Sequence, residues 1–192
     1  MSLMSHPLGY WRLKLQAITL LVFGRNAAAE RSFDQMLSRW PADAYALSSR
    51  THVRAQRGAR EAAIDDAQAL VSHHPKRSAA DWFNLAYLLE EAGRYEEAIP
   101  VFRSAVELDP KLDRAWYGLG LTLIRLRRLD EAVGALEHNT KLQPMSPYGW
   151  YQLARVQLDR QQPDETRKII RHLHGFEPKV AAQLERETGL AP

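Results

Sequence analysis

The sequence contains no cysteine and little glycine or proline. Its 192 residues include ten Gly and ten Pro. Without thiols the chain can form neither a disulfide framework nor a thiolate metal site, which is typical of a reducing compartment. Glycine and proline are also too scarce for a collagen-like or low-complexity chain. We therefore expect a folded protein located in the cytoplasm.

The sequence also lacks a hydrophobic run long enough to cross a bilayer. The longest run, Ala17–Phe23 (AITLLVF), is far shorter than the roughly 20 residues that a membrane-spanning helix needs. Arg12 and Lys14 precede it as in a secretory signal peptide, but Arg25 lies where cleavage requires small neutral residues. Any membrane contact is expected to be peripheral. Met4 is an alternative start, so residues 1–5 carry no structural expectation.

Neither sign of charge is in large excess. The chain has 26 Lys and Arg against 23 Asp and Glu, a net charge of +3. This balance falls well short of the basic surface that nucleic-acid binding needs, so no nucleic-acid partner is expected. The hydrophobic share of 45% is that of an ordinary globular protein.

No group of residues has the pattern of a catalytic or metal site. His172 and His174 would point about 200° apart on a helix, so they cannot hold one metal ion together. His73 and His74 suit a helix end, where a cation complements the helix dipole. There is no phosphate-binding glycine loop and no motif around a Ser, His and Asp set. The sequence therefore predicts no enzyme activity, no metal and no cofactor.

What the sequence does contain is a repeat of 34 residues. One tryptophan and one proline each recur three times at this spacing, at Trp82, Trp116, Trp150, Pro110, Pro144 and Pro178. Leucine and small residues recur in phase with them, at Leu85, Leu119, Leu153, Ala86, Gly120, Ala154, Ala98, Ala132 and Thr166. This pattern resembles the tetratricopeptide repeat (TPR) family.

The resemblance implies an all-α fold, a right-handed superhelical solenoid of about five helical hairpins with a C-terminal capping helix. Glycines at the expected hairpin turns (Gly24, Gly58 and Gly93) extend the phase upstream. The expected divisions are a tail at 1–9, degenerate repeats at 10–43 and 44–78, repeats at 79–112, 113–146 and 147–180, and a capping helix at 181–192.

Two glycines lie inside the expected first helix of repeat 113–146. Gly120 shares its position with Ala17, Ala86 and Ala154, where a small residue lets the two helices of a hairpin approach. Gly118 has no such equivalents and is expected to face the groove as a gap. The alternative is that a bulky tyrosine, Tyr87 or Tyr151, fills the space.

One pair of polar residues replaces an apolar pair of the later repeats. At the positions of Leu85 and Val101, repeat 44–78 has Arg50 and Asp66. Because the polarity changes at both positions together, we predict a structural ion pair between Arg50 and Asp66.

In the TPR family, the first helices of successive repeats line a concave groove that binds peptides or helices. The resemblance places the groove residues at Tyr45, His52, Phe83, Asn84, Tyr87, Arg114, Tyr117, Leu121, Arg125, Tyr148, Tyr151, Gln152 and Arg155. Tyrosine and arginine are enriched at interaction hot spots. We therefore expect a non-catalytic scaffold or adaptor that binds another protein. The alternative for the tyrosines is that they pack between neighbouring first helices.

The first repeat differs from the others because its groove positions are apolar: Trp11, Leu15, Ile18, Leu21 and Val22. A contiguous exposed apolar surface usually marks an interface. The candidate partners are a second copy of the chain, giving a homodimer, the Met1–Gly9 tail, or a segment of a membrane protein. The alternative function is thus a homo-oligomerisation module or a membrane-peripheral assembly module.

Overall fold

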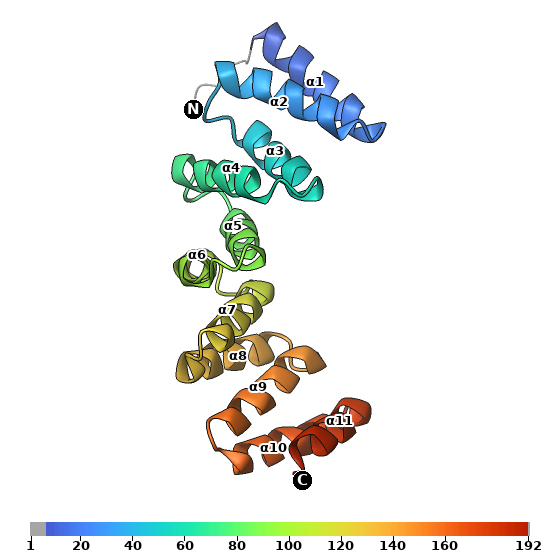
Figure 1. The fold of residues 1–192 in the computed structure, drawn as a ribbon, viewed down its shortest axis with the longest axis vertical. Helices are drawn as coiled ribbons and strands as arrows, with labels where there is room; N and C mark the ends of the chain where they lie inside the picture. Colours follow the sequence, from blue (N-terminus) through green and yellow to red (C-terminus); the bar gives the residue numbers. More distant parts are fainter. Residues whose placement is uncertain (1–6, 192) are drawn as a thin grey trace. The chain divides into compact units, whose positions relative to one another are not determined.

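The computed structural model describes residues 7–191 of the chain. Over this range the regular structure consists of eleven α-helices and no strand (Figure 1), which confirms the expected all-α fold. The helices form two compact units, Met1–Ala92 and Gly93–Pro192. The division falls between the two helices of the expected repeat 79–112.

The unit at residues 1–92 contains five helices, and each packs against the next one in the sequence. They are α1 (Leu8–Val22), α2 (Asn26–Arg39), α3 (Ala44–Gln56), α4 (Arg60–His73) and α5 (Ala79–Glu91). Leu8 and Gly9, which the sequence assigned to a tail, belong to α1. Residues 1–6 of that tail lie outside the described residues.

The unit at residues 93–192 contains six helices, and again each packs against the next. They are α6 (Tyr95–Leu108), α7 (Asp113–Arg125), α8 (Leu129–Leu142), α9 (Pro147–Asp159), α10 (Pro163–His174) and α11 (Pro178–Thr188). The last helix begins at Pro178, three residues before the expected capping helix, because proline suits the first position of a helix.

The turns between the paired helices share a left-handed residue. Gly24, Gly58 and Gly93 have φ values of +67°, +77° and +75°, which glycine adopts without steric cost. In the next two hairpins the equivalent residues are Arg127 and Gln161, with φ values of 58° and 60°. The turn geometry is therefore kept even where the residue is no longer glycine.

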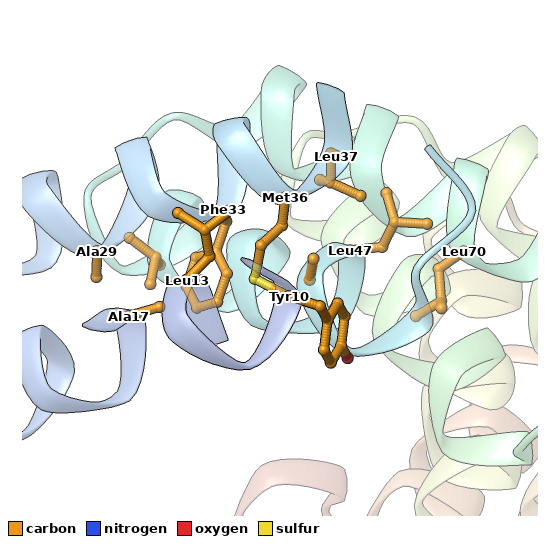
Figure 2. Close-up of a cluster of buried hydrophobic side chains, with 11 residues drawn as sticks. Tyr10, Leu13, Ala17, Ala29, Phe33, Met36, Leu37, Leu47 and Leu70 are labelled. Atoms are coloured by element: carbon orange, nitrogen blue, oxygen red, sulfur yellow. The ribbon is translucent and has the colours of Figure 1, made fainter. Parts of the chain in front are cut away.

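The core of the first unit lies between α1, α2 and α3. Phe33 and Met36 of α2 are fully buried and point toward α1, as Figure 2 shows. Ala17 of α1 and Ala29 of α2 are also fully buried, so the two helices meet through methyl groups. Burial of these side chains fixes the inner face of α1 and leaves its opposite face exposed.

The recurring tryptophans and prolines are joined by a hydrogen bond. The indole Nε1 of Trp116 donates to the carbonyl oxygen of Pro110 at 2.9 Å, and Trp150 donates to Pro144 at 2.9 Å. In the first unit Trp82 donates to the carbonyl of Pro75 at 2.8 Å. The tryptophan and the proline recur together because the indole of each tryptophan is hydrogen-bonded to the loop that contains the proline.

Gly118 is buried, and both expectations for its side-chain space are wrong. A Cβ atom added at Gly118 would lie 2.6 Å from Cε1 and Cζ of Phe102 on α6. The space is therefore filled by an aromatic ring from the preceding helix, and neither a groove gap nor Tyr87 or Tyr151 accounts for it.

Gly120 permits the close helix approach that its position indicates. An added Cβ would lie 2.8 Å from Cγ and Cδ2 of Leu136 on α8. Each glycine of α7 thus packs against one large side chain: Gly118 against Phe102 of α6, and Gly120 against Leu136 of α8.

We predict that Gly118→Ala destabilises the protein by about 1–3 kcal/mol, because the new methyl group overlaps the Phe102 ring. The matched control is Gly134→Ala in α8, where an added Cβ meets nothing within 4 Å. This control should stabilise by roughly 0.5–1 kcal/mol through helix propensity. Urea unfolding followed by circular dichroism measures both changes. Equal effects of the two substitutions would contradict the packing interpretation.

Candidate functional site

A groove of about 550 Å³ lies within residues 1–92. We call it the α3–α5 groove, because α3 and α5 supply most of its lining. The lining residues are Leu21, Ser48, Ser49, Thr51, His52, Ala55, Ala67, Leu70, Asp81, Asn84, Tyr87 and Leu88. The structure thus brings His52, Asn84 and Tyr87, three of the predicted groove residues, to one place, together with Leu21 of the predicted apolar surface.

The α3–α5 groove has an apolar part and polar groups beside it. Ala67, Leu70 and Leu88 are buried and supply aliphatic surface. Asn84 and Tyr87 are exposed, and Tyr87 stacks on Phe83 with ring centroids 6.3 Å apart. A groove of this size and mixed character can hold a few residues of a peptide.

The neighbouring amide of Gln56 orients the imidazole of His52. The Nε2 atoms of Gln56 and His52 are 3.0 Å apart, and the Gln56 amide is itself contacted by Asn26 of α2 at 3.4 Å. Because the side-chain nitrogen of Gln56 can only donate, His52 Nε2 accepts and the neutral ring carries its proton on Nδ1. His52 therefore offers a hydrogen-bond donor on the side not used by Gln56.

Asp81 is a groove residue that the sequence interpretation missed. Its buried carboxylate accepts from Arg77 Nη1 at 2.7 Å. It lies in the first turn of α5, which Ser78 caps by accepting from the amide of Ala80. The spacing from Ser78 to Asp81 is a helix-start signal, which indicates a structural carboxylate and gives no sign of a groove.

Behind the α3–α5 groove, Arg50 of α3 forms a two-bond ion pair with Asp66 of α4. Arg50 Nε donates to Asp66 Oδ2 at 2.8 Å, and Nη2 donates to Oδ1 at 2.6 Å. The third nitrogen of the same guanidinium reaches Asp34 of α2 at 2.7 Å. The pair expected from the sequence is therefore one part of a larger network.

Arg54 extends this network within α3. It donates to Asp66 Oδ2 at 2.9 Å and to Glu30 Oε1 of α2 at 2.9 Å, and Arg57 also contacts Glu30. Arg50 and Arg54 of α3, with Arg57 directly after the helix, thus face three carboxylates of α2 and α4. A single surface ion pair contributes little to stability. A cluster with several paired charges and two-bond geometry contributes more.

The network shifts the pKa of two of its members, Glu30 and Arg50. Burial alone would raise the pKa of Glu30, but the hydrogen bond from Arg54 and the charges of Arg54 and Arg57 outweigh it and lower that pKa. Burial would lower the pKa of Arg50, and its bonds to Asp66 and Asp34 raise it instead. Both shifts favour the charged forms of Glu30 and Arg50.

Two predicted groove residues of the first unit do not line the α3–α5 groove. Tyr45 is half-buried, with the Lys14 ammonium 4.0 Å from its ring centroid and the ring of Phe33 against it. Phe83 does not line the groove itself, but its ring stacks on Tyr87, which does. Tyr45 therefore follows the alternative, in which a tyrosine packs between neighbouring first helices.

In the second unit, the chain's own last helix contacts the predicted groove residue Tyr151, which Arg155 contacts in turn. The Tyr151 hydroxyl donates to Glu187 of α11 at 2.7 Å, and the Arg155 guanidinium lies 5.7 Å from the Tyr151 ring centroid. The hydrogen bond to Glu187, followed by burial, raises the pKa of Tyr151.

The other predicted groove residues of the second unit differ in exposure. Arg114, Arg125 and Tyr148 are exposed, whereas Tyr117, Leu121 and Gln152 are half-buried. They lie on α7 and α9, and the α3–α5 groove does not include them.

The described residues hold no metal-binding cluster of three or more His, Cys, Asp or Glu side chains. His138 and His172 stack on tryptophans instead, with centroids 4.3 Å from Trp116 and 4.4 Å from Trp150. In addition, none of the helices between residues 7 and 191 is both long and apolar enough to pass through a bilayer.

We predict strong coupling between Arg50 and Asp66. Arg50→Ala and Asp66→Ala should each cost about 1.5–3 kcal/mol, because each removes two charge-assisted hydrogen bonds while Asp66 keeps Arg54 and Arg50 keeps Asp34. The double variant should lose less than the sum, by about 1–3 kcal/mol. Unfolding by urea gives all four values. The exposed pair Arg127–Asp159 is the control, with coupling below about 1 kcal/mol; additive losses at Arg50 and Asp66 would refute the prediction.

We also predict that Glu30 contributes to acid sensitivity. Its lowered pKa means that the ionised form stabilises the fold above the ordinary value near 4.5, and this contribution is lost as pH falls through the folded value. The difference in unfolding free energy between wild type and Glu30→Gln should therefore shrink between about pH 6 and pH 3. Thermal melts across this range measure it. A difference that stays constant would show that Glu30 is not linked to protonation.

The chain is similar to known proteins in sequence profile and in fold. The tetratricopeptide repeat profile matches residues 49–113 and 83–138. No curated protein matches the chain. Among solved structures, MamA superposes with a TM-score of 0.81 at 17% identity, covering 96% of this chain and 97% of its own.

Two further structures show the same fold. A tetratricopeptide repeat protein from Parabacteroides merdae gives a TM-score of 0.79 at 20% identity, covering 95% of this chain and 75% of its own. YrrB, described as a TPR protein with an unusual peptide-binding site, gives 0.77 at 17% identity and covers 88% of each chain. Profile, helix pattern and superposition agree: residues 49–138 match the tetratricopeptide repeat family, and the chain has the fold of TPR proteins.

Proposed function

We propose that this protein is an interaction scaffold that binds a short segment of another protein in the α3–α5 groove. The observation that carries this proposal is the combination, in one groove, of aliphatic surface with exposed hydrogen-bonding side chains. A TPR fold supports a role in protein–protein interaction, and the peptide-binding site named for YrrB is consistent with a peptide ligand. No catalytic residue is needed for this function.

The groove suits an extended peptide because its two parts bind different atoms of a chain. An apolar side chain of the ligand can rest on Ala67, Leu70 and Leu88. The amide of Asn84 can donate to a ligand carbonyl and accept from a ligand N–H, which is the pattern of an extended backbone. His52 Nδ1 adds a second donor, and Tyr87 covers the ligand with a ring that loses little entropy on binding.

We predict that Asn84→Ala/Tyr87→Ala abolishes partner capture without unfolding the protein. Both side chains are exposed, so the melting temperature should stay close to that of wild type. Affinity capture from source cells, quantified by mass spectrometry, should show a partner retained by wild type and reduced roughly tenfold or more by the variant.

The matched control is Tyr148→Ala, which removes an equally aromatic and more exposed side chain from the second unit. Peptides that tile the captured partner are then titrated against the wild type, to show that one short segment is sufficient for binding. Equal capture by wild type and the Asn84→Ala/Tyr87→Ala variant would place the binding surface outside this groove.

A further inference from the structure

Helix α1 carries a row of exposed apolar side chains along its outer face. Leu8, Trp11, Leu15, Ile18 and Val22 are exposed by 37% to 90%, and Phe23 follows at 74%. The inner face, with Tyr10, Leu13 and Ala17, is already buried in the core. We call these five outer residues the α1 stripe.

The repeat architecture does not require apolar residues at these positions. Leu15 is equivalent, by the repeat spacing, to Ser49, Asn84, Gly118 and Gln152. Ile18 and Val22 likewise correspond to His52 and Gln56 of α3. A polar residue is therefore compatible with the fold at each of these places, and the α1 stripe needs another explanation.

The spacing of the α1 stripe is that of a helix-pairing seam. The five residues follow one another at intervals of three, four, three and four, which is the a/d pattern of a heptad repeat. On a helix they span less than about 100°, a narrow seam that matches one partner helix better than the broad apolar face of a membrane-surface helix.

The charges around the stripe indicate the chemistry of the partner. Arg12 and Lys14 flank it, and α1 contains no acidic residue. The only acidic side chains of α2, Glu30 and Asp34, are already paired with the arginines of α3. The surface at α1 is therefore cationic and complements a helix with carboxylates beside its apolar row.

A second copy of α1 fits this surface poorly. Lys14 lies next to Leu15, the midpoint of the helix. An antiparallel pair crossing at the midpoint would bring the two Lys14 ammonium groups together, and a parallel pair would place Lys14 opposite Thr19, with no carboxylate to meet. Like charges at these flanking positions oppose pairing.

We propose that α1 docks an amphipathic helix of a different protein, with apolar residues at heptad spacing and Glu or Asp beside them. The ligand helix lies along the α1 stripe, and its carboxylates meet Arg12 and Lys14. None of the five stripe residues lines the α3–α5 groove, although the adjacent Leu21 does, so variants of the stripe and of the groove test the two sites separately.

The test uses a three-heptad synthetic peptide with Leu at positions a and d and Glu at positions e and g, which is monomeric because its carboxylates repel. Fluorescence anisotropy measures its binding to the full chain. We expect binding that is roughly tenfold or more tighter than for the same peptide with Lys at e and g. Leu15→Glu/Ile18→Glu should abolish it, whereas Arg12→Glu/Lys14→Glu should reverse the preference between the two peptides.

The control variant is Met145→Glu/Tyr148→Glu, which replaces comparably exposed apolar residues of the second unit and should leave binding unchanged. Melting temperatures verify that each variant is folded, and Asn84→Ala/Tyr87→Ala should bind the acidic peptide as wild type does. Failure to bind the acidic peptide, or equal binding of both peptides, overturns the proposal.

Two further measurements identify other occupants of the stripe. A dimer in sedimentation velocity that Leu15→Glu/Ile18→Glu converts to a monomer would assign the stripe to a second copy. Binding to vesicles containing phosphatidylglycerol, without binding to the peptide, would assign it to an anionic lipid surface. Either result would also overturn the proposal.

Discussion

The structure depends on close packing between adjacent helices, in which a large side chain of one helix occupies the space beside a glycine of its neighbour. In the second unit, Phe102 of α6 occupies the place of a side chain at Gly118, and Leu136 of α8 does the same at Gly120. Interiors packed at this density tolerate no added methyl group without movement. The loss of helix propensity at the two glycines is offset because both neighbouring helices can then approach α7 closely.

In the first unit, an ionic cluster takes a place that apolar contacts hold in the later repeats. Arg50 and Arg54 of α3 tie α2 to α4, and α3 also lines the α3–α5 groove on its other side. Directional hydrogen bonds fix the rotation of a helix more narrowly than aliphatic packing does. The cluster therefore positions Ser48, Ser49 and His52 for the groove although none of these three residues belongs to it.

The sequence predicted the helices and the Arg50–Asp66 contact because both follow from comparing equivalent positions along the chain. It could not predict the partner of Gly118, since Phe102 reaches it from the preceding repeat and the two residues share no common pattern. Tyr45 occupies a groove position of its repeat, and this position alone predicts a groove residue. The repeat pattern does not reveal that Lys14 of the preceding repeat packs on the Tyr45 ring. Asp81 and the floor residues Ala67 and Leu70 were missed because a groove floor has the same composition as a core. The use of the groove and of the α1 stripe remains a prediction.

The fit of Phe102 against Gly118 also fixes the order of the repeats. At the Gly118 position the other repeats have leucine, serine, asparagine and glutamine, and the Cβ atom of each would meet the ring of Phe102. Exchanging repeat 113–146 with a neighbour, or duplicating a neighbour into its place, would therefore create a steric conflict at this junction. Although the repeats share one period, repeat 113–146 is therefore not interchangeable with its neighbours at this junction.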